Sequence, residues 1–259
     1  MKAIWTGAIG FGLVNIPVRV FSATMEHELD FDMLDKKDHS RIRFRRVNET
    51  TGKEVLWENI VKGYDYKGKY IIMTDEDFEK ASPEKSKLIE ISEFVDEDQI
   101  EVIFFETPYY LEPQKSGEKA YALLREALKK SGKVGIANFI LRTRESLCVL
   151  KAIDNTIVLN KIRFGREIKD PGELNIPSRV SIKPEELKMA IALIERHGST
   201  FDSNKYKDTY TDSLLKLIHA KAKGKKVETP QLRVVHNKAK DLMSQLKASL
   251  ETNKRRKAS

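Results

Sequence analysis

The chain has 259 residues, a formal net charge of +8 and a single cysteine, Cys148. This length provides one large domain or one domain with appendages, and one cysteine excludes an internal disulfide or a zinc site built from several cysteines. Because the sequence has no run of 18 apolar residues and no signal-peptide cleavage pattern, we expect a cytoplasmic protein without a membrane partner.

Short strands dominate the N-terminal part of the chain. The opening segment, residues 3–24, is rich in β-branched and aromatic residues, and its glycines Gly7, Gly10 and Gly12 indicate bends. Alternating apolar and polar residues, or short apolar runs, predict further strands at 28–35, 40–47, 53–57, 70–73, 87–95 and 100–106, with a turn at 48–52.

Two helices and three more strands follow in the middle of the chain. Thr74 and Asp77 resemble a capping box that begins a short helix. Residues 116–131 form the clearest amphipathic helix, and Gly132 suits its C-terminal cap. Residues 134–164 predict three strands with short connections. Many short strands with one main helix are typical of a closed barrel or a sandwich.

The composition changes between Asp170 and Pro184, where prolines and turn dipeptides indicate an irregular crossing segment. Beyond it, residues 185–198 and 210–224 predict two amphipathic helices. A strand-rich body followed by two such helices suggests an interlocking dimer. The alternative is that both helices pack back on the body of the same chain.

The charge is distributed in blocks. Residues 36–69 carry 10 basic and 5 acidic side chains, residues 114–170 carry 13 and 6, and residues 201–259 carry 15 and 6. Residues 70–113 are acidic, with 3 basic and 13 acidic side chains. The basic blocks predict a polyanionic partner. Simple solubility is the alternative interpretation.

Within the first basic block, Arg41, Arg43 and Arg45 recur at every second position. On a strand this spacing puts all three side chains on one face, about 6.5–7 Å apart, so the row can follow the phosphates of one DNA strand. Guanidinium groups bind phosphates through paired donors. An arginine row without a recognition helix favours contact with the DNA backbone over sequence readout. Ordinary solvated charges on an exposed hairpin are the alternative.

Further cations extend this candidate interface. They are Arg46 and Lys53 on the same predicted hairpin, Lys62 after it, and Arg142 and Arg144, which repeat the two-residue spacing on another strand. No aromatic residues interleave with the arginine row as a stacking platform would require, so single-stranded partners are less favoured.

No motif for catalysis or cofactor binding is present. The sequence lacks a P-loop, an HExxH pair and a GxSxG turn. The acidic clusters at 75–77 and 96–98 are interpreted as solvated or helix-capping groups, and Cys148 as a buried structural thiol. We therefore expect a protein that is not an enzyme and that uses no metal or cofactor.

Several long segments, in the same order, resemble the bacterial Ku family of DNA-end-binding proteins. They are the opening WTGAIGFGLVNIPVRVFSAT, the hairpin DKKDHSRIRFRRVNETTGKEV, the stretch TPYYLEPQKSGEKAYALLREAL with the following ILRTRESLCVL, and the helical LIERHGSTFDSNKYKDTYTDSLLKLIHAKAKGK. Because these matches run along almost the whole chain, they are far more specific than a short motif.

The resemblance implies a mainly β fold with α: a β-barrel core over residues 1–184 with a long bridging hairpin at about 36–69, a helical dimerisation arm at 185–224, and a ligase-recruiting segment with a short basic tail at 225–259. A homodimer would close a ring around a double-stranded DNA end, and the protein would then be nucleoid-associated. The C-terminal segment would recruit a multifunctional ATP-dependent DNA ligase for non-homologous end joining. The residues that match the recruiting piece are Asp241, Leu242, Leu246 and Leu250.

Two other functions stay open. A non-specific nucleic-acid-binding β-barrel would bind a sealed DNA circle as well as a linear duplex. A metal-dependent nuclease that uses the acidic block would degrade a duplex when Mg²⁺ is added.

Overall fold

The computed structural model describes residues 1–25, 28–81, 87–141, 144–177 and 179–225, together with Met243 and Leu246. The chain divides into two units, Met1–Asp170 and Pro171–Ser259. Each unit is described by itself below.

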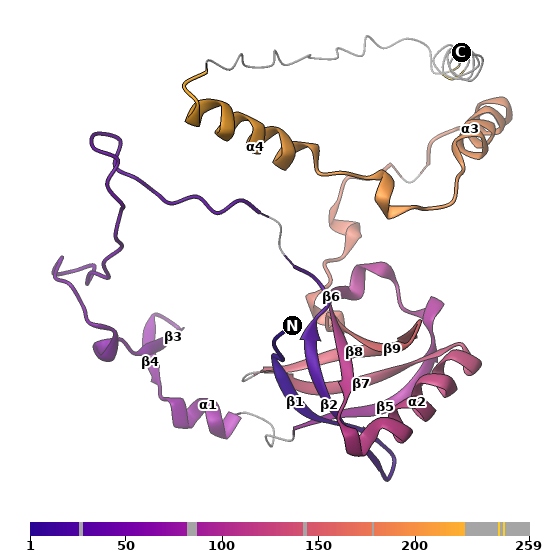
Figure 1. Cartoon of the computed structure of the whole chain (residues 1–259), viewed down its shortest axis with the longest axis horizontal. Helices are drawn as coiled ribbons and strands as arrows, with labels where there is room; N and C mark the ends of the chain where they lie inside the picture. The colour runs from indigo at the N-terminus through magenta and orange to yellow at the C-terminus, as the bar shows by residue number, and fades with distance from the viewer. Residues whose placement is uncertain are drawn as a thin grey trace. The chain divides into compact units, whose positions relative to one another are not determined.

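The first unit is built on a closed seven-stranded barrel (Figure 1). Around the barrel the strands follow the order β1-β2-β6-β9-β8-β7-β5. Their bounds are β1 Trp5–Phe11, β2 Val14–Ser22, β5 Leu88–Asp96, β6 Phe105–Pro113, β7 Lys133–Leu141, β8 Arg144–Ile153 and β9 Thr156–Ile162. The prediction of a barrel is therefore confirmed, as are the strands near 87–95 and the three strands of 134–164.

A single parallel pair closes the barrel. Neighbouring strands pair antiparallel, except that β1 pairs parallel with β5 through Ala8 and Leu88. Gly7 and Gly10 do not mark bends as expected, because both lie inside the continuous ladder of β1 with β2. Gly7 is required there for close packing: a Cβ atom would lie 2.3 Å from the carbonyl oxygen of Lys87. Of the three glycines, Gly12 alone lies in the turn between the strands.

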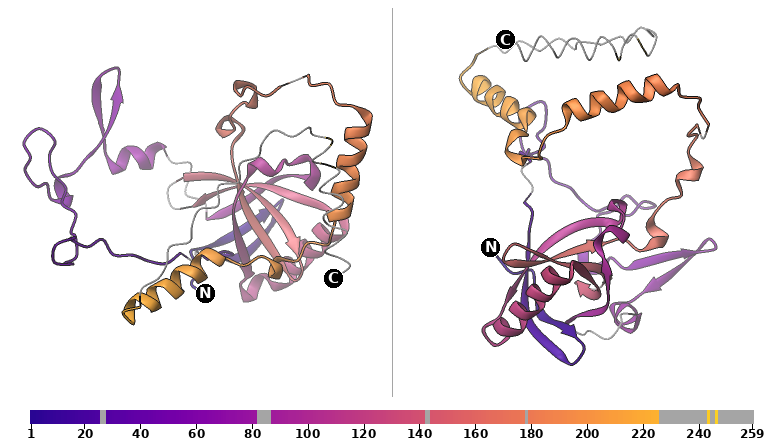
Figure 2. Two further views of the ribbon diagram at one scale, coloured as in Figure 1. Left: turned by 90° about the horizontal axis from the view of Figure 1, so that it is seen from above. Right: turned by 90° about the vertical axis from the view of Figure 1, so that its right-hand side faces the viewer.

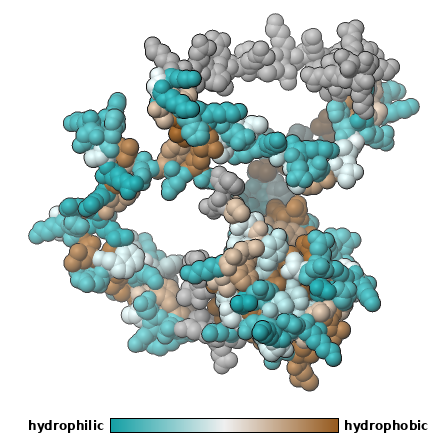
Figure 3. Space-filling view, viewed as in Figure 1, coloured by the Kyte–Doolittle hydropathy of each residue, from teal (hydrophilic) through white to brown (hydrophobic). Residues whose placement is uncertain are grey.

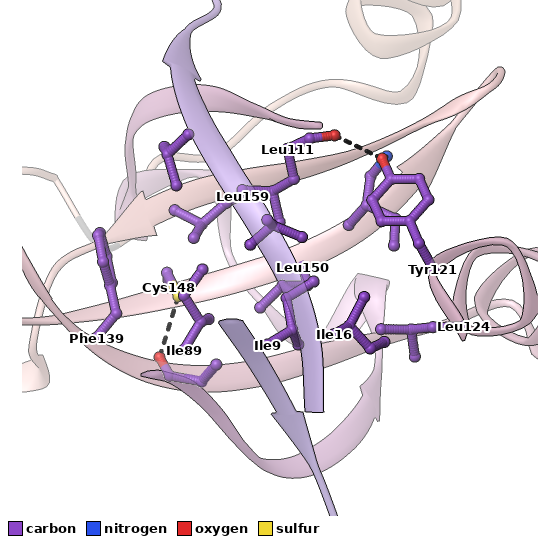
Figure 4. Packing of buried hydrophobic residues seen from close by; sticks show 14 of the residues in the cluster. Ile9, Ile16, Ile89, Leu111, Tyr121, Leu124, Phe139, Cys148, Leu150 and Leu159 are labelled. Carbon is purple, nitrogen blue, oxygen red and sulfur yellow. Dashed lines mark hydrogen bonds between the residues drawn. The ribbon is translucent and has the colours of Figure 1, made fainter. Parts of the chain in front are cut away.

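Helix α2 (Glu118–Ser131) completes the core of the barrel. Its buried residues Tyr121, Leu124 and Leu128 belong to the same hydrophobic cluster as Ile9 and Leu150 of the strands, and Figure 4 shows Tyr121 and Leu124 beside these barrel residues. Two further views show α2 alongside the strands (Figure 2). The predicted helix and its cap are confirmed, since Gly132 is left-handed (φ 67°) and its amide donates to the carbonyl of Leu128.

A second, smaller apolar cluster includes Val134, Val149 and Ile162. It is covered by the segment before β6, where two 3₁₀ helices, η2 (Glu97–Gln99) and η3 (Val102–Phe104), precede the strand. The predicted strand at 100–106 is therefore wrong over most of its length. Phe104, in η3, and Phe105, the first residue of β6, both pack on this cluster, so burial accounts for the apolar residues at this end of the segment.

Residues 23–87 leave the barrel after β2 and return at β5; we call this segment the excursion. It contains η1 (Trp57–Asn59), the two-stranded sheet of β3 (Lys62–Tyr66) and β4 (Lys69–Met73), and α1 (Asp75–Ala81). The capping box of α1 is confirmed: the Thr74 amide donates to Asp77 Oδ2 at 2.9 Å, and the Asp77 amide donates to Thr74 Oγ1 at 3.2 Å.

The predicted strands at 28–35, 40–47 and 53–57 do not form. In the described part of these segments, strand pairing is limited to two isolated bridges. Nearly every residue from 28 to 61 is exposed, and an alternating pattern with no layer to pack against does not stabilise a regular sheet. Asp and Asn side chains also bind the backbone here and compete with a ladder.

The second unit begins with η6 (Pro171–Glu173) and contains α3 (Pro184–His197), η7 (Ser203–Lys205) and α4 (Thr209–Ala222). Both predicted helices are thus confirmed to within a residue or two. No residue of α3 or α4 is buried. In Figure 3 apolar surface lies among polar surface on the excursion and on this unit.

Candidate nucleic-acid interface

The arginine row lies on a stretch of the excursion that pairs with its own flanks at two places. Leu34 forms an isolated bridge with Arg41, and Val47 forms one with Glu54. Each bridge closes a short turn, and residues 42–46 connect the two turns without regular secondary structure. The row is therefore not on a strand, and the expectation that strand geometry puts its side chains on one face is wrong.

Two arginines of the row are paired with carboxylates. Arg41 Nη2 lies 2.8 Å from Asp32 Oδ2, and Arg45 Nη1 lies 3.1 Å from Glu54 Oε2. All four side chains are at least half exposed, so each pair stabilises its turn only weakly, by about 0.2–1 kcal/mol.

The other cations of the predicted hairpin are also exposed. The Arg46 guanidinium stacks over the Trp57 ring at 4.6 Å from its centroid. Within the described part of the chain, no carboxylate lies within ion-pair distance of Arg43 or Lys53. Arg43 therefore stands without a counter-ion, midway between two arginines that each have one.

Lys62, the first residue of β3, lies at the far end of this cationic stretch. Its ammonium is 3.8 Å from Asp75 Oδ1 and 4.7 Å from the centroid of the Phe78 ring. Both partners come from α1, so Lys62 joins the small sheet to that helix. Its side chain is 72% exposed, which leaves most of the ammonium open to solvent.

The remaining predicted site residues are described only in part. Arg144 begins β8, where its backbone pairs with Leu141. Arg142 lies outside the described residues, as do Asp241, Leu242 and Leu250 of the predicted ligase-recruiting piece. Leu246 is helical and partly exposed.

Three basic residues of the barrel pair with the acidic block and are only partly exposed. Lys133 binds Asp96, Lys151 binds Glu97 and Lys161 binds Glu106, with Nζ–O distances of 2.8, 2.5 and 2.9 Å. In contrast, every basic side chain of residues 36–69 is exposed. The excursion is therefore the part of the first unit where positive charge is most available to a polyanion.

The described residues of the acidic block form no metal centre. Among the described residues, no group of three or more His, Cys, Asp or Glu side chains is arranged to hold a metal ion. Hydrogen bonds from the Thr74 amide and hydroxyl lower the pKa of the Asp77 carboxyl, which fits a helix-capping group.

No helix within the described ranges is long and apolar enough to cross a membrane.

Sequence reasoning missed the groups that shape the arginine stretch. These are the paired carboxylates of Asp32 and Glu54 and the first turn, where Asp35 Oδ1 accepts a backbone hydrogen bond at 2.8 Å. The turn predicted at 48–52 is confirmed, and there Asn48 Oδ1 accepts a backbone hydrogen bond at 3.0 Å. A signal for the first turn was present, because Asp followed by polar residues favours such turns. It was outweighed by the alternation of apolar and basic residues.

A family model described as the Ku70/Ku80 beta-barrel domain matches residues 10–189. This span contains the excursion, six of the seven barrel strands in full and the start of α3. The fold and this match together define a barrel protein of the Ku type. The chain belongs to the Ku family.

Three relatives, each named "Non-homologous end joining protein Ku", illustrate the similarity. The protein of Pseudomonas aeruginosa is 41% identical over 225 residues, which cover 85% of this chain and 77% of that protein. That of Coxiella burnetii is 36% identical over 264 residues, covering 99% and 96%. That of Archaeoglobus fulgidus is 40% identical over 256 residues, covering 98% and 100%.

A solved structure, the SPOC domain of human PHD-finger protein 3, matches with a TM-score of 0.31 and 12% identity, covering 62% of this chain and 95% of that one. This likeness is too weak to support an argument.

Proposed function

We propose that this protein binds the ends of double-stranded DNA as a ring-shaped homodimer, without reading sequence, and acts in non-homologous end joining. Membership of the Ku family and the names of its relatives support this proposal. The observation that carries it is the excursion: a Ku-type barrel presents a stretch, residues 36–69, in which all 10 basic side chains are exposed.

The charge distribution supports contact with the sugar–phosphate backbone. Arginines bind phosphates through paired donors and keep their charge at any physiological pH. Contact with phosphates needs only accessible cations, whereas sequence readout needs side chains that reach the base edges. Such binding loses affinity steeply as salt rises, because each neutralised phosphate releases counter-ions.

The second unit supports the homodimer. Ile191 and Ile194 of α3 are 46% and 71% exposed, although both belong to the apolar stripe that the sequence predicts as a packing face. A second copy of the chain would bury this apolar face of α3. We assign residues 185–224 as a dimerisation arm on this basis.

The assignment of residues 225–259 as a ligase-recruiting segment rests on the resemblance of DLMSQLKASLE to the recruiting piece of the family. In this proposal Asp241, Leu242, Leu246 and Leu250 contact a multifunctional ATP-dependent DNA ligase. The basic residues that follow add non-specific attraction to DNA.

One experiment tests end binding directly. A plasmid is prepared linear and covalently closed, and gel shifts are measured at two salt concentrations. We expect binding of the linear form, and we expect complexes to remain on the DNA when the ends are sealed after binding. A matched variant, Arg43→Glu with Arg45→Glu, should lose end binding while it remains a dimer.

The other outcomes identify the alternatives. Equal binding to linear and closed plasmid would indicate a nucleic-acid-binding barrel without end preference and would overturn the proposal. Degradation of the duplex that depends on added Mg²⁺ would indicate a nuclease.

A further inference from the structure

The two turns that flank the arginine stretch share one hydrogen-bond pattern. In the first turn the Asp35 amide donates to the Ser40 carbonyl and the His39 amide donates to the Asp35 carbonyl, both at 2.8 Å. In the second turn the Asn48 amide donates to the Lys53 carbonyl and the Gly52 amide donates to the Asn48 carbonyl, also at 2.8 Å. His39 and Gly52 hold the same left-handed position, with φ of 59° and 64°.

The side chains of the turns repeat as well. Asp35 Oδ1 accepts from the amide two residues on, and so does Asn48 Oδ1, at 2.8 and 3.0 Å. At the fourth residue of each turn, Asp38 Oδ1 and Thr51 Oγ1 also accept a hydrogen bond from the amide two residues later, at 2.9 and 3.4 Å. Each residue of the second turn lies the same number of residues after the equivalent residue of the first turn, as Asn48 does after Asp35. The segment thus contains two turns with the same hydrogen-bond geometry.

The ion pairs occupy equivalent positions in the two turns, but with the charges exchanged. In the first turn the acid, Asp32, precedes the turn and Arg41 follows it. In the second turn Arg45 precedes and the acid, Glu54, follows. As a result both arginines lie on the segment that connects the turns, and both acids lie on the outer flanks.

This exchange divides the arginines of the row by their electrostatic surroundings. A phosphate that approaches Arg41 or Arg45 must compete with a carboxylate already within 3.1 Å. Arg43, between them, has no such competitor among the described residues, and its side chain is exposed. A cation without a counter-ion gains most from a phosphate.

We infer that the row has two roles: Arg41 and Arg45 are positioning residues that close the two turns, and Arg43 contacts the phosphodiester backbone of DNA. This inference rests on the proposed function, because it assigns the contacts of that same surface. It predicts that neighbouring arginines, two residues apart, respond differently to the same substitution.

The salt dependence of binding distinguishes the roles. Affinity of the full chain for a blunt linear duplex is measured over a range of salt concentrations. Each cation that neutralises a phosphate contributes about 0.9 to the slope of log affinity against log salt. Arg43→Gln should reduce the slope by that amount for each Arg43 in contact. Arg45→Gln, the matched control, should leave the slope unchanged while it lowers affinity by less than Arg43→Gln does.

A charge exchange provides the second test. Arg45→Glu combined with Glu54→Arg restores the ion pair but moves the arginine to the outer flank. A positioning role predicts recovery of both affinity and slope relative to Arg45→Glu alone. A slope that stays reduced in the exchanged variant, or an equal loss of slope in Arg45→Gln and Arg43→Gln, would overturn the inference. Failure of the unmodified protein to bind the linear duplex would instead overturn the proposed function.

Discussion

The hydroxyl group of Tyr121 on α2 donates a hydrogen bond of 2.7 Å to the backbone carbonyl oxygen of Leu111 on β6. The same hydroxyl oxygen accepts a hydrogen bond of 2.6 Å from the backbone amide of Ile157 on β9 (Figure 4 shows the first of these bonds). All three residues are buried. One phenol therefore connects the helix to two neighbouring strands and satisfies backbone groups that water does not reach.

Replacement of this phenol by Tyr121→Phe should destabilise the barrel. The Ile157 amide would lose its partner in a buried position, which costs about 1–3 kcal/mol. Urea unfolding followed by circular dichroism measures the change. Tyr110→Phe is the matched control, because Tyr110 is 40% exposed and its hydroxyl makes no hydrogen bond to any described residue. Equal stability of the two variants would contradict the role assigned to Tyr121.

The Cys148 thiol should be unreactive in the folded protein. It is fully buried in the core and lies 3.3 Å from the Ala137 carbonyl oxygen, to which it donates. Burial raises the pKa of the Cys148 thiol well above its ordinary value, so the reactive thiolate is depleted at neutral pH. A disulfide reagent should label the protein only after unfolding in urea. Rapid labelling without denaturant would show that the barrel opens readily.

The capping box of helix α1 should weaken in acid. Hydrogen bonds from Thr74 lower the pKa of Asp77 below its ordinary 3.8, so the ionised carboxylate is the form that caps. The stabilisation is complete above pH 3.8 and is lost as the pH falls through the lowered pKa of the folded state. The protection of α1 amides from hydrogen exchange, relative to their intrinsic exchange rate at each pH, should decrease over that range, and Asp77→Asn should remove the effect. Glu76→Gln, in the same turn, is the control.

The apolar face of α3 should hold the dimer together. Ile191→Glu with Ile194→Glu puts two charges in the face that a second copy would cover, where burying an unpaired charge is strongly unfavourable. Sedimentation should then detect a monomer with an intact barrel. Ala192→Glu, on the opposite side of the helix, should leave the dimer unchanged. A dimer that survives the first variant would remove this face from the interface.

The C-terminal segment should be needed for ligation and dispensable for binding. A chain that ends at Lys240 lacks the ligase-recruiting piece and the basic tail. We expect it to bind linear duplex DNA with little loss, since the excursion is intact, and to lose stimulation of a partner ATP-dependent ligase. End joining of a linear plasmid is the readout. Full stimulation by the truncated chain would contradict the assignment.

The barrel could be predicted from the sequence because its strands face a core. In the span from Lys133 to Ile162, buried residues such as Ala137 and Leu150 recur with the period of a strand, and the short connections leave little choice of pairing. Helix α2 could be predicted equally well, because its apolar stripe indicates a helix and Gly132 indicates where that helix ends. Packing and local signals pointed the same way in both cases.

The arginine stretch could not be predicted in the same way. Residues 40–47 alternate like a strand, but Phe44 is 79% exposed, so no burial enforced the pattern. There the local capping by Asp35 and Asn48 decided the backbone conformation. The ion pairs of Arg41 and Arg45 depend on acids nine residues away, and nothing in the alternation indicates them. The identity of the cations was predictable, and their partners were not.

The parallel pairing of β1 with β5 has a consequence for how the barrel folds. The whole excursion separates Ala8 from Leu88 along the chain. The contact between β1 and β5 that closes the barrel is therefore one of the most distant in sequence. Lengthening such a connection costs little at equilibrium, about 0.6 kcal/mol per doubling, but distant contacts slow folding. Insertions into the excursion should therefore delay barrel closure during synthesis far more than they weaken the finished protein. The excursion, which we propose contacts DNA, is thus free to change in length while the barrel that carries it stays the same.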